Sequence, residues 1–299
     1  MLAAGVVFSL LAVAQLAATQ LPPPQEAPRR ALSDLITANH ILHHRSIIDS
    51  FGHVSIRHPN DSSVYIMAAS AGNTVSRAAD LYYYRVNDSQ PLPFPNGTMP
   101  GSVSARSERF IHGEIMRRYS ETNAVVHSHA LPMLTYATGL ISLVPVYHMA
   151  AFMGLNVPLW DITPLYNSTE RQDMLVNNAR FGSALAAAFS NSTSTSDNPS
   201  TLPTYPLVLQ RYHGFSTAAT SLSNVVYQSI YATDNAVVQT AQLEARRAVG
   251  GEALGSIEAL SLNEVQVSTG LGADDYAFRA WEGFAWEVQH LSDYVNELR

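Results

Sequence analysis

The stretch AVVHSH at residues 124–129 is a short apolar run that ends in two histidines, His127 and His129. Its first three residues are small or β-branched, which is typical of a strand. Side chains two positions apart on a strand point to the same face of a sheet, so the two imidazoles should project together. Two convergent histidines form half of a metal site. The alternative is that both are surface histidines on an edge strand.

Two further segments contain residues that would complete such a site. Glu108 lies in RSERFIHGE (106–114), at the predicted start of a helix, where the terminal amides favour a carboxylate. His213 lies in QRYHG (210–214), directly after a predicted strand. Three neutral imidazoles and a carboxylate suit zinc, manganese or iron(II), and such an ion acts as a Lewis acid on a substrate oxygen. The sequence therefore predicts a site for a divalent metal ion.

Helices and strands alternate along the chain, which predicts an α/β fold with a layered core. Ser33 is the predicted N-cap of the first helix. Predicted helices cover residues 34–50, 107–119, 171–189, 223–249 and a last region that opens at Ser261 and Glu264 and includes 281–298. Predicted strands cover residues 53–57, 64–68, 124–129, 158–162 and 207–211. Long loops are expected at residues 88–102 and, as a Ser/Thr/Asn-rich surface insertion, at 190–205.

The composition excludes several classes of protein. The 299 residues include 17 Lys and Arg against 24 Asp and Glu, a net charge of −7, and contain no basic run. Nucleic acid is therefore not an expected partner, because phosphate neutralisation requires clustered basic side chains. The absence of cysteine excludes disulfides, thiolate nucleophiles and zinc–thiolate sites. With 46% hydrophobic and 14% charged residues, the composition is that of a globular protein.

The N-terminal stretch differs from the rest of the chain. Residues 1–19 are uncharged and almost wholly apolar, which predicts a secretory signal peptide with cleavage between Ala14 and Gln20. The alternative is a buried N-terminal helix. Residues 20–31 would then form a proline-rich linker and 32–299 the main domain with a C-terminal helical extension. No membrane association is expected after signal cleavage.

Five N-x-S/T sequons support the secretory route, because each lies in a polar stretch that is typical of a loop. We expect a glycoprotein that is secreted or resides in the lumen of the secretory pathway. A chain of this length can bury a core without disulfides, so the absence of cysteine is compatible with that location. The sequons begin at Asn60, Asn87, Asn96, Asn167 and Asn191.

Four motifs, in this order along the chain, resemble those of the class II aldolase/adducin family. The resemblance covers roughly residues 32–250, and Glu108 precedes His127 by 19 residues, in agreement with the family's spacing. The motifs are GHVSIR (52–57), RSE (106–108), HSH (127–129) and HG (213–214).

The resemblance implies a fold, a metal site and an assembly. The expected fold is a three-layer α/β/α sandwich around a mostly antiparallel central sheet. His127, His129 and His213 are expected to bind the metal ion, with Glu108 as the acid/base residue or a fourth ligand. Members of the family are commonly homotetramers with sites between subunits, and they act on small-molecule substrates.

The motifs depart from those of family members that cleave sugar phosphates. His53 replaces a turn asparagine and Arg106 replaces the first of two serines that bind the phosphate in those enzymes. The GHVS turn and the run after Ser107 are instead similar to a branch that contains hydroxypyridine dicarboxylate decarboxylases, and the chain resembles a secreted, fungal-type member. Candidate substrate-binding residues are therefore His53, Arg106, Ser107 and His148, each with a structural role as the alternative.

The expected function is that of a divalent-metal-dependent carbon–carbon lyase, most simply a decarboxylase of a hydroxy-aromatic or related hydroxy-carboxylic acid. A retro-aldolase for a small hydroxy-carbonyl substrate would use the same site. Two further candidate functions are those of a non-catalytic adducin-like binding protein and of an iron-dependent oxygenase. Adducin-type members lose the metal histidines, whereas this chain keeps them, which favours an enzyme.

Other histidines lie close to these motifs. His112 falls one helical turn after Glu108 and is predicted either to support the site or to be structural. His40, His43 and His44 on the first helix are predicted to form a solvated face, with a three-histidine metal site as the alternative.

Overall fold

The computed structural model describes residues 23–100, 106–190, 201–249, 258–272 and 274–299. The predicted signal peptide, the start of the predicted linker and the sequon at Asn191 lie outside the described residues. In the part of the chain that is described, no helix is long and apolar enough to cross a membrane.

A seven-stranded sheet forms the centre of the fold, in the order β3-β2-β1-β4-β7-β6-β5. Neighbouring strands run antiparallel except for β5 and β6, which are parallel. The prediction of an α/β fold with a mostly antiparallel sheet is therefore confirmed. The strands are β1 (His53–His58), β2 (Asp61–Ala68), β3 (Leu81–Arg85), β4 (Ala124–Ser128), β5 (Leu159–Trp160), β6 (Leu207–Gln210) and β7 (Gly214–Ala219).

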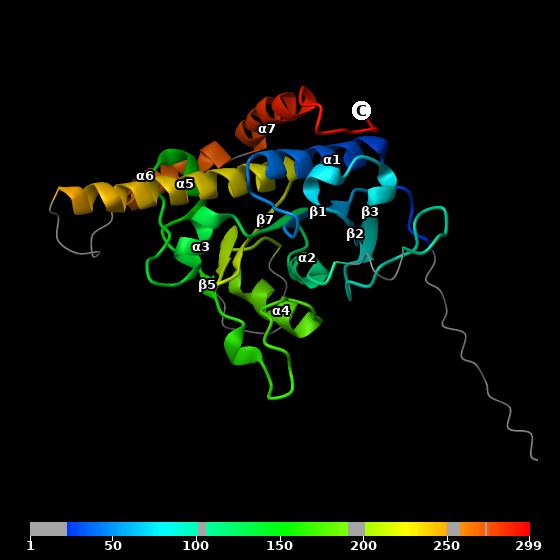
Figure 1. Ribbon diagram of the computed structural model, residues 1–299, viewed down its shortest axis with the longest axis horizontal. Coiled ribbons are helices and arrows are strands. Elements are labelled where there is room, and N and C mark those ends of the chain that lie inside the picture. The colour runs from blue at the N-terminus through cyan, green and yellow to red at the C-terminus, as the bar shows by residue number, and fades with distance from the viewer. Residues whose placement is uncertain (1–22, 101–105, 191–200, 250–257, 273) are drawn as a thin grey trace, which may run out of the picture.

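Helices lie on both faces of the sheet (Figure 1). On β4, Ala124 and Val126 belong to one hydrophobic cluster and Val125 to another, because alternate side chains point to opposite faces. Side chains of α1 and α5 join the first cluster, and those of α2 and α4 join the second. The helices are α1 (Arg29–His44), α2 (Arg109–Arg118), α3 (Leu131–Ala137), α4 (Ala179–Ala188), α5 (Leu222–Ala248), α6 (Leu262–Ser268) and α7 (Asp274–Gln289).

Helix α1 differs from its prediction at both ends. It begins at Arg29, inside the predicted linker, and ends at His44, six residues before the predicted end. The prediction that Ser33 caps this helix is wrong. The Leu32 N–H already donates to Pro28 O, the first bond of the helix, so Ser33 lies within it.

The histidines of α1 do not form a solvated face, so that prediction is wrong for His40. This side chain is fully buried, and its Nε2–H donates to Val75 O at 2.7 Å. His43 Nδ1 lies 2.9 Å from Tyr294 Oη. Only His44 is exposed.

The predicted helix over residues 171–189 is wrong in its first half, because α4 begins only at Ala179. Met174 has a positive φ of 65°, which is incompatible with an α-helix. The Val176 N–H donates to Glu108 Oε1 rather than to a carbonyl one turn earlier. The segment therefore forms a loop that reaches Glu108.

The C-terminal residues run along α1 (Figure 1). Helix α7 ends at Gln289, so the prediction of a helix through residue 298 is wrong. Residues 290–299, here called the C-terminal strap, bond to α1 instead of continuing the helix. Asn296 Nδ2 donates to Thr37 Oγ1 at 3.1 Å, and the Arg29 side chain donates to two backbone carbonyls of the strap.

Candidate active site

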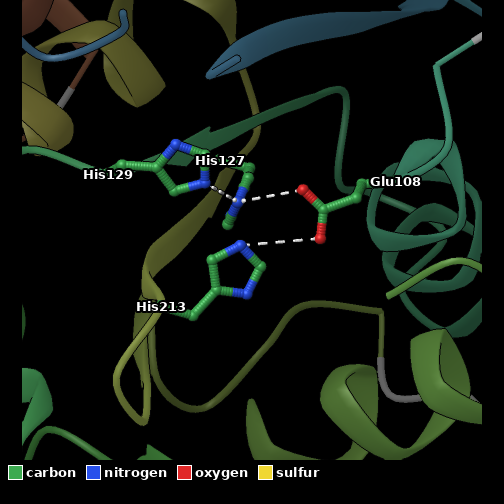
Figure 2. A group of neighbouring side chains, drawn as sticks. All are labelled: Glu108, His127, His129 and His213. Carbon is green, nitrogen blue, oxygen red and sulfur yellow. Dashed lines mark hydrogen bonds and ion pairs between the residues drawn. The ribbon is translucent and has the colours of Figure 1, made fainter. Parts of the chain in front are cut away.

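Four side chains predicted to form a site lie together in the structure (Figure 2). Glu108, His127, His129 and His213 each offer one ligand atom, and these atoms lie within 4.8 Å of one another. The Nε2 atoms of His127 and His129 are 3.0 Å apart. Glu108 Oε2 lies 3.5 Å from His127 Nε2, and Glu108 Oε1 lies 3.6 Å from His213 Nε2. No other group of metal-ligating side chains with this spacing occurs in the described residues.

The pairing of β4 with the hairpin of β6 and β7 places the three histidines. His127 lies on β4, His129 directly follows this strand, and His213 lies in the turn between β6 and β7. The residue after His213 must be a glycine, because a Cβ on Gly214 would lie 2.1 Å from Ser128 O. The His-Gly sequence therefore lets the turn approach the end of β4 closely enough for the imidazoles to meet.

Glu108 occupies the N-cap position of α2, but its side chain makes no capping hydrogen bond. The expectation that the terminal amides of this helix hold the carboxylate is therefore wrong. Instead, Oε1 accepts a hydrogen bond from Val176 N–H at 3.0 Å. Burial raises the pKa of Glu108 to about 7, although the Val176 N–H acts in the opposite direction. A carboxyl group with this pKa can both release and take up a proton near neutral pH.

The second ring nitrogens of two histidines face groups that would orient them. His129 Nδ1 lies 3.5 Å from Asp49 Oδ1, and His127 Nδ1 lies 3.2 Å from both Ser216 Oγ and Gln210 Nε2. Gln210 Oε1 is buried and has no hydrogen-bond partner among the described residues in this amide orientation. A 180° rotation of the amide lets Oε1 accept from an Nδ1–H of His127. That is the tautomer required when Nε2 binds a metal.

The protonation states also fit a metal ion. Burial lowers the pKa of His127 well below its usual value and that of His213 to about 4. These imidazoles are therefore neutral at pH 7, the form that binds a metal through a ring nitrogen. The set of three imidazoles and one carboxyl group thus suits zinc, manganese or iron(II), with Glu108 beside the ion or bound to it.

His53 lies next to this cluster. It opens β1 and pairs in register with His127 on β4, and the two ring centroids are 5.2 Å apart. Its Nδ1 lies 2.6 Å from His112 Nε2, so His112 supports His53 rather than the cluster itself.

Arg106 is half-buried, and its side chain bonds to the surrounding backbone. Its guanidinium group donates to the carbonyl oxygens of Ser50, Ala68 and Ser70. No carboxylate of the described residues forms an ion pair with it, and burial lowers its pKa. The guanidinium nevertheless remains charged at neutral pH, so a positive charge that no described carboxylate pairs with lies two residues before Glu108.

The two remaining candidates lie outside the cluster. Ser107 is exposed and directly precedes Glu108. His148 is exposed at the start of a 3₁₀ helix (His148–Met153) that packs against α5 and α6. His148 is therefore not part of the group of four ligand atoms.

The groups that orient the ligands were not predicted from the sequence. They are Asp49, Gln210, Ser216 and the backbone N–H of Val176. Asp49, Gln210 and Ser216 lie within three residues of the recognised motifs, whereas Val176 does not. None of them carries a local pattern of its own, because their role depends on contacts across the sheet or with a loop.

The fold and this group of side chains together define a class of protein. The profile of the Class II Aldolase and Adducin N-terminal domain matches residues 33–240, which is more than half of the chain. The chain therefore belongs to the class II aldolase/adducin family, as its motifs predict.

The chain is similar to two relatives in sequence and to a solved structure in fold. The chain is 34% identical over 264 residues to Decarboxylase tropJ of Talaromyces stipitatus, covering 87% of this chain and 95% of that protein. It is 26% identical over 194 residues to 3,4-dihydroxyphthalate decarboxylase of Arthrobacter keyseri, covering 64% and 69%. L-fuculose 1-phosphate aldolase from Glaciozyma antarctica superposes with a TM-score of 0.64 at 16% identity, covering 92% and 97%. The aldolase shares the fold, and the two decarboxylases support a lyase of this superfamily.

Proposed function

We propose that the protein is a divalent-metal-dependent decarboxylase of a hydroxy-aromatic or related hydroxy-carboxylic acid. The observation that carries this proposal is the convergence of three imidazoles and one buried carboxyl group within 4.8 Å. The similarity to two proteins named as decarboxylases supports the choice of reaction. Zinc is the proposed ion, with manganese and iron(II) as the alternatives that share its ligand preferences.

When bound, the ion would polarise a substrate oxygen and stabilise the negative charge that remains as carbon dioxide leaves. The bond between the carbon and its carboxylate breaks, and the electron pair stays on the carbon. The Glu108 carboxyl group then donates a proton to this carbon and regains one from water. His53 and Arg106 are proposed to bind the substrate's anionic oxygens through charge-assisted hydrogen bonds. Ser107 and His148 remain proposed substrate contacts.

The test is elemental analysis of the purified protein, followed by a screen for carbon dioxide release from hydroxy-aromatic acids. We expect about one divalent ion per chain and turnover that stops on chelation and returns when the ion is restored. Cleavage of a hydroxy-carbonyl compound without release of carbon dioxide would replace the proposal with a retro-aldolase. A requirement for oxygen would replace it with an oxygenase. Full metal occupancy without any turnover would favour a binding protein.

We also propose that the protein is secreted or lumenal and carries N-linked glycans. The asparagines of the four described sequons are exposed, so each is accessible in the folded domain: Asn60, Asn87, Asn96 and Asn167. Expression in a eukaryotic host should yield a glycoprotein that begins near residue 20 and decreases in mass on glycosidase treatment. Full-length, unglycosylated protein in the cytosol would contradict this proposal.

A homotetramer with sites between subunits is the proposed assembly. Large apolar side chains next to the site residues are exposed in the isolated chain: Phe51 by 69%, Leu131 by 78% and Tyr212 by 59%. Burial of such side chains against another subunit would be favourable. Light scattering of the purified protein should give four times the chain mass, and a monomer would contradict the proposal.

A further inference from the structure

A hydrogen-bonded chain of three side chains lies beside the histidine cluster. It runs from Ser55 on β1 to His112 on α2 and returns to His53 on β1. Ser55 Oγ is 2.6 Å from His112 Nδ1, and His112 Nε2 is 2.6 Å from His53 Nδ1. Ser55 and His112 are 0% exposed and His53 is 2% exposed. Because Ser55 and His112 are fully shielded from solvent, their hydrogen bonds must be satisfied within the protein.

The number of available hydrogens determines which group donates in each of these two hydrogen bonds. A serine hydroxyl has one hydrogen, and a neutral imidazole has one N–H group and one acceptor nitrogen. If Ser55 donates to His112 Nδ1, then His112 carries its proton on Nε2 and donates it to His53 Nδ1. The hydrogens of Ser55 and His112 then both have acceptors. The remaining proton lies on His53 Nε2, at the end of the hydrogen-bonded series, and this atom is not fully enclosed.

The opposite direction leaves a hydrogen without an acceptor. His53 Nδ1–H would donate to His112 Nε2, and His112 Nδ1–H would donate to Ser55 Oγ. The Ser55 hydroxyl hydrogen would then have no acceptor among the described residues, at a position that is 0% exposed. Buried donors without an acceptor are rare because their desolvation is not compensated. The first direction is therefore the stable one.

The surroundings keep His112, the middle residue of this hydrogen-bonded series, neutral. Burial, together with the nearby Arg106 guanidinium group, lowers the pKa of His112 to about 3. A neutral His112 has a single N–H group, as the direction above requires. His112 therefore passes on the orientation set by Ser55 and does not act as a cation.

This direction determines which ring nitrogen of His53 carries the proton. Since its Nδ1 accepts from His112, its own proton is on Nε2. This Nε2 forms no hydrogen bond with any residue that the structure describes. The His53 ring lies beside that of His127, with centroids 5.2 Å apart, so an N–H group is left free next to the metal-ligating cluster.

We infer that Ser55 and His112 are positioning residues that fix the tautomer of His53, so that its Nε2–H group donates a hydrogen bond to an oxygen of the bound substrate. The identity of this oxygen, in a hydroxy-carboxylic acid, rests on the proposed function. His53 is then a hydrogen-bond donor, and neither a general base nor a metal ligand.

The tautomer can be measured directly, without any enzymatic assay. Zinc-loaded protein labelled with ¹⁵N-histidine is examined by ¹⁵N–¹H correlation NMR, and His53→Gln identifies the signals of His53. We expect a proton on His53 Nε2 and an unprotonated Nδ1. A proton on Nδ1 would overturn the inference, whatever the outcome of the activity screen.

Substitutions then test whether Ser55 and His112 control this tautomer. In His112→Gln, the amide can accept from Ser55 and donate to His53, so the Nε2–H tautomer should persist. In His112→Leu and in Ser55→Ala, the direction is no longer fixed, and signals of both tautomers should appear. An unchanged tautomer in His112→Leu would show that His112 does not position His53. Ser55→Ala removes a single oxygen and serves as the second variant if His112→Leu does not fold.

Kinetics with a substrate found by the screen provide the second measurement. His112→Leu should lower kcat/KM by roughly 10–100-fold at unchanged zinc content, and His112→Gln should restore most of the loss. His58→Gln is the matched control, because His58 is a buried histidine on the same strand whose ring nitrogens bond to the backbone of Gln25 and Asn60. Equal losses in the Gln and Leu variants of His112 would contradict a role in positioning. Complete absence of turnover in the wild type would count against the proposed function, while the NMR result tests this inference independently of turnover.

Discussion

Replacement of Glu108 by glutamine separates proton transfer from metal binding. The two side chains have nearly the same shape, and the amide oxygen can keep the hydrogen bond from Val176 N–H, which is 3.0 Å long in the wild type. The three imidazoles are unchanged. We therefore expect Glu108→Gln to fold normally and to retain most of its metal.

We expect Glu108→Gln to lose activity because an amide cannot carry and donate a proton to the substrate as a carboxyl group does. General acid catalysis contributes about 10²–10⁴-fold in rate, which corresponds to about 3–5 kcal/mol of the barrier. The decrease should appear in kcat, because Glu108 acts during the reaction and not only in substrate binding.

The assay is the initial rate of carbon dioxide release, with metal content measured on the same sample. Glu114→Gln is the matched control: Glu114 is a buried glutamate on α2 that pairs with Arg117 at 2.7 Å and has no contact with the histidines. This control should lose some stability but keep its rate. A Glu108→Gln enzyme with turnover within fivefold of the wild type would refute the assigned role.

Four further outcomes are expected. His213→Ala should reduce the bound metal at least tenfold by elemental analysis, because one of three imidazoles is lost. Gly214→Ala should destabilise the fold by about 1–3 kcal/mol in urea unfolding, since the new Cβ would lie 2.1 Å from a backbone oxygen of β4. Metal-free protein should become less stable as the pH falls from 7 to 5. Burial lowers the pKa of His40 to about 4 and that of His112 to about 3, so the unfolded chain binds more protons below pH 6.5, at about 1.4 kcal/mol per histidine and pH unit. Asn296→Ala should lower the free energy of unfolding by about 1–2 kcal/mol, because its amide donates to α1 at 2.9 and 3.1 Å.

The sequence predicts those elements whose patterns are local. The strand that carries His127 and the long helix α5 were predicted within one residue of their observed bounds, because their apolar runs and the absence of breakers are visible in short windows. The grouping of His127, His129 and His213 with Glu108 was also predictable, since each lies in a short motif with a fixed place in the family.

Other elements depend on contacts that no short window contains. Every residue of β7 is buried, so this strand shows no alternation of polar and apolar side chains and was not predicted. β3 reads LYYYR and likewise does not alternate. The loop before α4 does not form the predicted helix, because the Val176 N–H donates to Glu108, 68 residues earlier in the sequence, and no short window contains this contact. The partners of Arg106 are backbone carbonyls, which sequence patterns do not reveal.

The C-terminal strap affects the order in which the molecule can be completed during synthesis. Asn296 bonds to Ser33 and Thr37, and Arg29 bonds to Leu298, so these contacts join parts of the chain that are separated by 259 to 269 residues. On the ribosome, α1 is made among the first elements of the domain, yet its outer side cannot be covered until the strap has emerged. Nascent chains must therefore carry an incompletely covered α1 through almost the whole of translation. We therefore expect the strap to close the fold last, and a chain that stalls before residue 290 to expose the surface of α1 to chaperones and proteases.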